Sequence, residues 1–160
     1  MKKLTMFFGG VILAANFGSA AFANSPDVYV VKFRADDNAE STVLDAQLPS
    51  AIAMAGANIE EVVIDTSTAA KWEKGAHEAF DRDIVPVFNK WVGLPGFAAI
   101  VDAKSKRVLG CVNSSFDAGE MAKELRKYAA SASGQPRMSN ASTITKTTKC
   151  PAAHNVDTGL

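Results

Sequence analysis

Residues 28–41 read VYVVKFRADDNAES, and this stretch decides the fold. Its first part, 28–33, is a run of β-branched and aromatic side chains without polar alternation, which predicts a strand buried on both faces. Asp36, Asp37 and Asn38 follow and are typical of a turn that ends in a helix N-cap. Apolar residues then recur at helical spacing, so the pattern predicts a helix over about 40–55. The chain therefore opens on a β-α unit.

The rest of the chain supplies the partners of this unit. In order, we expect a strand over 59–64, helical residues over 68–91 with a break near 83–86, strands over 97–101 and 107–112 joined by a polar turn, and a helix over 118–128. A β-α-β crossover requires parallel pairing, whereas a short turn joins antiparallel strands. The sequence predicts an α/β fold with a mixed sheet of about four strands and helices on both faces.

The N-terminal segment has the pattern of a secretory signal. Lys2 and Lys3 precede an apolar run, and Ala21-Phe22-Ala23 fits a small-x-small cleavage site before Asn24. The apolar run is too short for a bilayer span, which needs ~20 apolar residues. We interpret 1–23 as a signal peptide of bacterial type. The mature protein is then periplasmic or secreted and not bound to the membrane.

The C-terminal segment differs in composition from the body. Residues 131–149 are rich in Ser, Thr and Lys, and Ile144 is their one large aliphatic side chain. Such a segment buries too little apolar area to offset the entropy of ordering it. We predict one folded domain at 24–130 and a flexible tail at 131–160.

Composition and charge exclude some classes of function. The chain has 160 residues, with 17 Lys and Arg against 17 Asp and Glu. A net charge of zero argues against a nucleic-acid partner, because nucleic-acid-binding proteins usually present a basic face. Its 2 cysteines are too few for a closed four-cysteine zinc site.

The order of elements and four local motifs resemble the thioredoxin-like superfamily. The segment VVKFRADDNAES is similar to the strand and turn that carry the family's Cys-x-x-Cys motif, with Phe33 and Ala35 matching. GLPGF at 93–97 resembles the loop with the family's cis-proline, so Leu94, Pro95 and Gly96 would form that loop. AKSKRV at 103–108 resembles the hairpin turn, and SFDAGEMAKELRKYA at 115–129 resembles the final helix.

The chemistry of the family does not carry over with this resemblance. Asn38 and Ser41 occupy the places of the two cysteines, and Lys32 lies near the place of a buried acidic residue. Dithiol exchange needs a thiolate of low pKa and a second, resolving thiol. An amide and an ordinary hydroxyl supply neither. The resemblance therefore implies a redox-inactive protein without this catalytic site.

A non-catalytic role is the first functional hypothesis. In the family, the cis-proline loop offers backbone groups to an extended peptide, and that contact needs no cysteine. We expect Pro95 to be cis and the loop to bind an unfolded or extended polypeptide, or to serve in an assembly of the cell envelope. No cofactor is expected.

The two cysteines leave a second hypothesis open. Cys111 lies in the fourth predicted strand and Cys150 in the tail. In an oxidising compartment they can form a disulfide that fastens the tail to the domain. Alternatively, Cys111 is buried as a small apolar residue and Cys150 is a free thiol. A free thiol would allow thiol–disulfide exchange, an enzymatic function.

A third hypothesis is the handling of copper. Cys150 and His154 are ligand types that copper accepts. They are only two ligands, in a predicted flexible tail, so we expect no bound metal.

Overall fold

The computed structural model describes residues 25–134 and 149–153. Its elements are β1 (Val28–Arg34), α1 (Ala39–Ala55), β2 (Ile59–Asp65), α2 (Ala69–Asp81), α3 (Val85–Trp91), β3 (Phe97–Asp102), β4 (Val108–Asn113) and α4 (Ala118–Ala132). The predicted order of strands and helices is confirmed, including the division of 68–91 into two helices. The last helix runs to Ala132, beyond the predicted end at Tyr128.

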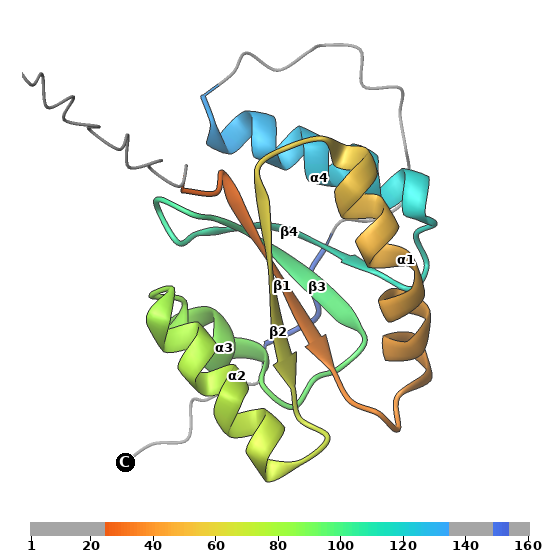
Figure 1. The fold of residues 1–160 in the computed structure, drawn as a ribbon, viewed down its shortest axis with the longest axis vertical. Helices are drawn as coiled ribbons and strands as arrows, with labels where there is room; N and C mark the ends of the chain where they lie inside the picture. The colour runs from red at the N-terminus through yellow and green to blue at the C-terminus, as the bar shows by residue number, and fades with distance from the viewer. Residues whose placement is uncertain (1–24, 135–148, 154–160) are drawn as a thin grey trace, which may run out of the picture.

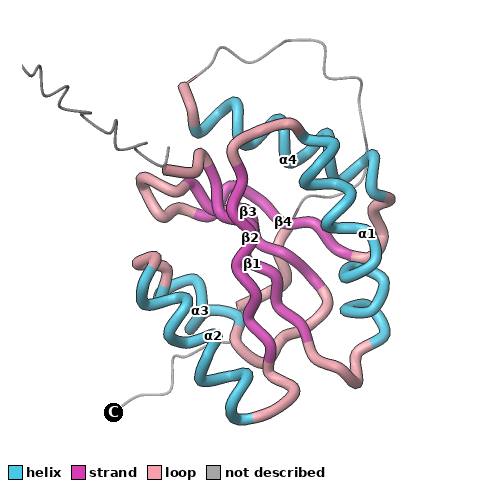
Figure 2. Tube along the Cα trace, viewed as in Figure 1, coloured by secondary structure: helices cyan, strands magenta, loops and turns pink. Residues whose placement is uncertain are grey.

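The four strands form one mixed sheet in the order β2-β1-β3-β4. The crossover through α1 makes β1 and β2 parallel, and β3 is antiparallel to both β1 and β4. The loops that follow β1 and β2 therefore lie at the same end of the sheet (Figure 2). In the described part of the chain, β2 and β4 are the edge strands.

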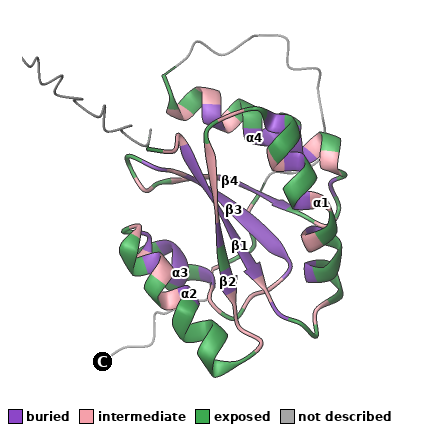
Figure 3. Ribbon diagram, viewed as in Figure 1, coloured by how far each residue is buried: buried purple, intermediate pink, exposed green. Residues whose placement is uncertain are grey.

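Helices cover both faces of the sheet, as predicted. Figure 1 shows α1 and α4 on one side and α2 and α3 on the other. Each pair closes its own apolar cluster: Val30 belongs to the cluster under α1 and α4, and its neighbour Val31 to the cluster under α2 and α3. Side chains alternate between the faces of a strand, so the unbroken apolar run of β1 serves both clusters. Figure 3 shows β1 and β3 as buried, with exposed outer faces on the helices.

The helix ends follow from local chemistry. Gly56 ends α1 in the left-handed conformation, with φ 59°, as its position in the sequence predicts. Asp117 and Glu120 form a capping box at the start of α4. Arg126 of α4 donates to the carbonyls of Met54 and Ala55, the last acceptors of α1. These contacts fix the two helices beside each other.

The predicted tail is partly ordered, which corrects the expectation for 131–160. Ala132 is helical, and Cys150 packs against the apolar cluster under α2 and α3. A disulfide joins Cys150 to Cys111, and the indole Nε1 of Trp91 donates to the carbonyl of Pro151 at 3.2 Å. A covalent bond and a buried anchor order this segment where its composition alone would not.

Other terminal predictions lie outside the described residues. These are the signal peptide at 1–23 and the tail segments 135–148 and 154–160. Within 25–134 and 149–153, no helix has the length and apolar character needed to cross a bilayer.

Candidate functional site

The start of α1 is a closed hydrogen-bond network. Asn38 is the N-cap, and its Oδ1 accepts from the backbone N–H and the hydroxyl of Ser41, each at 2.8 Å. The Ser41 hydroxyl oxygen in turn accepts from the Ala35 N–H at 3.2 Å, and Ser41 is fully buried. Both polar side chains are thus engaged in capping. Neither Asn38 nor Ser41 therefore offers a thiol or a free hydroxyl as a nucleophile.

The loop at 93–96 packs directly on this network. A Cβ placed on Gly96 would come within 2.8 Å of Glu40 Cβ and 3.0 Å of Asn38 Oδ1. The Gly96 N–H donates to the Phe33 carbonyl at 2.9 Å, which joins the loop to the end of β1. The structure therefore brings together the two segments that the resemblance singled out, Asn38–Ser41 and Leu94–Gly96.

The expectation that Pro95 is cis is wrong. The part of the chain that the structure describes contains no cis peptide bond. Gly93 and Gly96 flank Leu94 and Pro95 with φ values of 86° and 98°. These left-handed conformations, which glycine adopts without steric cost, turn the chain without a cis bond. The carbonyls of Leu94 and Pro95 accept no hydrogen bond from the described residues.

The two cysteines of the chain form one disulfide. Cys111 is 3 % exposed in β4, and Cys150 packs beside it against the cluster under α2 and α3. The bridge spans 39 positions of sequence. This confirms the disulfide alternative over a free Cys150 and leaves no free thiol in the described chain. In the disulfide, Cys150 is also unable to bind a metal as a thiolate.

A network of charged side chains at the end of β1 and β2 was not predicted. Lys32 is buried and pairs with Asp45 at 2.9 Å and Glu61 at 2.8 Å. Arg34 bonds Asp45, Asp36 and Asp65 through its guanidinium, and Lys71 of α2 joins Asp36 at 2.7 Å. The network ties β1, α1, β2 and α2 together. Lys32 and Arg34 two positions apart in an otherwise apolar strand were the available signal, because buried cations need anionic partners.

The partners in this network shift one another's pKa. Burial by itself would lower the pKa of Lys32, but its bonds to Glu61 and Asp45 outweigh burial and raise it. For Asp65, burial favours protonation, yet bonds from Ser67, Lys71 and Arg34 lower its pKa to about 2. Both side chains stay charged at neutral pH, which suits a structural electrostatic network.

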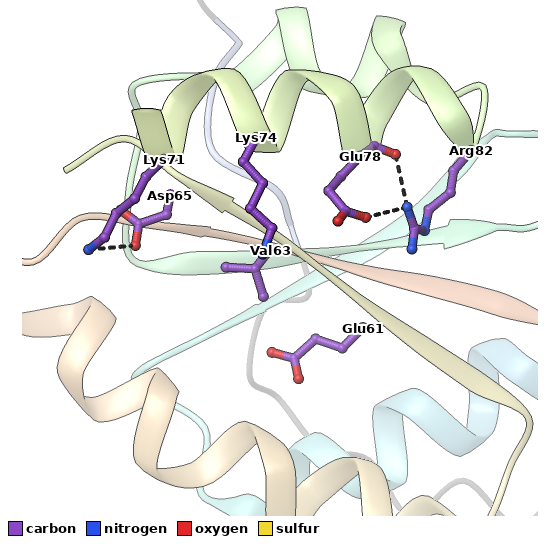
Figure 4. A pocket seen from close by; sticks show the side chains of 7 residues that line it. All are labelled: Glu61, Val63, Asp65, Lys71, Lys74, Glu78 and Arg82. Atoms are coloured by element: carbon purple, nitrogen blue, oxygen red, sulfur yellow. Dashed lines mark hydrogen bonds and ion pairs between the residues drawn. The ribbon is translucent and has the colours of Figure 1, made fainter. Parts of the chain in front are cut away.

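A surface pocket of about 410 Å³ lies between α2 and the outer edge of β2. Figure 4 shows its lining: β2 contributes Glu61, Val63 and Asp65, and α2 with the residue after it contributes Lys71, Lys74, Glu78 and Arg82. The strand residues alternate along β2 and the helical ones recur at 3- and 4-residue spacing, so each set lies on one face of its element. The pocket is therefore a short channel parallel to the edge strand.

Most of the polar side chains in these two regions are engaged in bonds within the protein. The residues in 25–134 and 149–153 include no group of His, Cys, Asp and Glu that could hold a metal ion. The polar side chains at the start of α1 are occupied in capping, and those along the pocket are mostly ion-paired. No family model, curated protein or solved structure that was compared with the chain matches it.

Proposed function

We propose that this chain is an exported thioredoxin-like protein without redox activity, which binds an extended polypeptide. The export step rests on the signal pattern at 1–23, and the compartment would be the periplasm or the exterior of a bacterium. The fold assignment is supported by the strand order β2-β1-β3-β4 with β3 antiparallel to its neighbours. Covalent closure of a peripheral segment by a disulfide is in keeping with an oxidising compartment.

The observation that carries this function is the contact of the 93–96 loop with the start of α1. In the thioredoxin family such a juxtaposition brings a peptide-binding loop to the redox-active cysteines, and the contact of Gly96 with Asn38 and Glu40 supports the same role for this loop. The loop offers the carbonyls of Leu94 and Pro95 as hydrogen-bond acceptors. An extended peptide carries the N–H donors that such acceptors require.

The test uses a polypeptide that cannot exchange thiols. The mature chain would be titrated into fluorescently labelled, reduced and carboxymethylated α-lactalbumin, and binding followed by anisotropy. We expect saturable binding that iodoacetamide treatment leaves unchanged. Leu94→Ser combined with Pro95→Ala should weaken it by about fivefold, because the loop loses apolar contact and rigidity. Lys104→Ser, at an exposed position of the β3–β4 turn, is the matched control.

Two results would speak against the proposal. One is equal binding by the double variant and the control, which would remove the loop from the interface. The other is capture of only thiol-bearing polypeptides, as mixed disulfides through Cys111 or Cys150. That second result would favour the alternative of a thiol–disulfide exchange protein. Copper retention that depends on Cys150 and His154 would favour a metal-handling accessory.

A further inference from the structure

The outer edge of β2 has backbone groups without strand partners. Toward β1, Thr66 N–H donates to the Arg34 carbonyl, and the Asn58 carbonyl accepts from Asp27 N–H. Backbone groups alternate in direction along a strand. The N–H and C=O groups of Glu61, Val63 and Asp65 therefore point away from β1, and no described residue bonds to them.

These three residues are also the β2 side of the pocket. Their outward backbone groups thus lie at the edge of β2 that borders the pocket. Gly75 lets α2 lie close on β2, since a Cβ there would already meet Ile64 Cα at 3.4 Å. Val63 at the centre is 38 % exposed. The edge thus has the free backbone donors and acceptors, and the exposed apolar side chain at its centre, that an added strand uses.

The charges along the channel are paired with one exception. Glu61 pairs with Lys32, Asp65 with Arg34 and Lys71, and Arg82 with Glu78 and Glu60. Lys74 has no anionic partner in the described chain, and Figure 4 shows its side chain extending from α2 toward Val63. The channel therefore presents one unneutralised cation to whatever occupies it.

We infer that the β2 edge is a binding site for an extended segment of another polypeptide, which adds as a strand and places an acidic side chain at Lys74. This inference rests on the proposed polypeptide-binding role and assigns it a second surface. Main-chain hydrogen bonds to Glu61, Val63 and Asp65 would provide the affinity for the added strand. Lys74 would provide the preference for an acidic side chain in it.

A second copy of this chain fits the edge poorly. If two β2 strands paired antiparallel about Val63, Glu61 of each copy would lie opposite Asp65 of the other. Like charges directly opposite each other on one face of a sheet are destabilising. The charge pattern thus disfavours self-association and favours a different chain.

The experiment separates backbone pairing from side-chain contact. The probe is a fluorescein-labelled heptapeptide of alternating Thr and Val with a central Asp, titrated with the mature chain. Val63→Pro removes the central outward N–H and leaves the bonds to β1 intact, because proline is tolerated on the open side of an edge strand. We expect about tenfold weaker binding for Val63→Pro and less than about twofold change for Val63→Ala.

A charge reversal tests the role of Lys74. Lys74→Glu should reverse the preference, so that a heptapeptide with central Lys binds about fivefold tighter than the Asp peptide. Lys123→Glu, at an exposed position of α4, is the matched control and should keep the Asp preference. Should Val63→Pro fail to fold by circular dichroism, the same heptapeptide N-methylated on alternate amides tests pairing with the unaltered protein.

Several results would overturn this inference. Equal affinity of Val63→Pro, or of the N-methylated probe, would exclude strand addition. An unchanged preference in Lys74→Glu would exclude the acidic partner. If the protein forms dimers and Val63→Pro converts them to monomers, the segment that occupies the β2 edge is a second copy of the chain. If removal of 154–160 tightens binding of the probe, the occupant is this chain's own C-terminus. Carboxymethylated α-lactalbumin binding that needs Leu94 and Pro95 but not Val63 would leave the proposed function standing without this site.

Discussion

Single charged side chains decide how the end of β1 and β2 is held together. Asp65 is 13 % exposed and accepts bonds from Arg34, Lys71 and Ser67. Burial opposes its charge, but these donors lower its pKa to about 2, below the ordinary 3.8. A carboxyl with a depressed folded-state pKa contributes stability above its unfolded pKa and loses it as pH falls through the folded value.

Replacement of this carboxylate should therefore lower the free energy of unfolding at neutral pH and leave it unchanged in strong acid. We expect Asp65→Asn to destabilise the protein by about 1 kcal/mol at pH 7, after solvent screening is allowed for, with the difference vanishing between pH 4 and about pH 2. Urea unfolding at several pH values measures this. Asp37→Asn, an exposed aspartate of the nearby loop, is the control. A difference from wild type that persists at pH 2 would assign the effect to packing.

Contacts between elements, and not the conformation of Pro95, shape the loop before β3. Gly96 and Gly93 both have positive φ, but only Gly96 touches α1, where an added Cβ would meet Glu40 and Asn38. Any other residue is strained at either position.

Comparison of the two glycines separates strain from packing. Gly93→Ala should cost about 1 kcal/mol, from backbone strain alone, because nothing lies within 4 Å of its Cβ. Gly96→Ala should cost about 2–3 kcal/mol, because the steric conflict with Glu40 adds to the same strain. Thermal unfolding of both variants measures the difference. Equal losses would mean that the loop moves off α1 at no cost.

The start of α1 tests the relation to dithiol proteins directly. A thiol at position 38 would sit at a helix N-terminus, which lowers its pKa, and one at 41 would lie beneath it. We expect Asn38→Cys combined with Ser41→Cys to form a disulfide and to catalyse insulin reduction by dithiothreitol. The wild type should not, and Asn38→Cys alone should stop at a mixed disulfide. An inactive, non-bridged double variant would argue against thioredoxin-like geometry at this turn.

The helices and strands could be predicted because each has a local signal in the sequence. The contacts of the candidate site could be predicted only in part. The unbroken apolar run at 28–33 indicated a central strand, and Asn38 and Gly56 marked the two ends of α1. Contacts between residues that are far apart in the sequence have no such local signal. The position of Lys32 in the sequence does not identify Asp45 and Glu61 as its ion-pair partners, because these pairs form only when α1 and β2 pack beside β1. The cis prediction for Pro95 failed because the flanking glycines accomplish the turn.

The arrangement of layers explains why the C-terminal segment matters to a small domain. The sheet carries two separate apolar clusters, and the one under α2 and α3 is bordered by β4 at the sheet edge. Cys150 completes that border through its bond to Cys111, and Pro151 accepts the hydrogen bond of the buried Trp91 indole. The disulfide thus holds residues 149–153 covalently at one of the two clusters.

Reduction of this disulfide should lower the free energy of unfolding without abolishing the fold. A loop closed by two cysteines 39 positions apart contributes about 4 kcal/mol in the chain-entropy description. We expect reduction by dithiothreitol to cost about 3–4 kcal/mol in urea unfolding, and Cys150→Ser to match the reduced wild type. Cys111→Ser should cost more, because it also places a hydroxyl at a site that is 3 % exposed. Trp91 emission should shift as its bond to Pro151 breaks, with Trp72→Phe used to isolate its signal. Unchanged stability and emission on reduction would mean that 149–153 stays docked by its other contacts, and that the disulfide adds no stability.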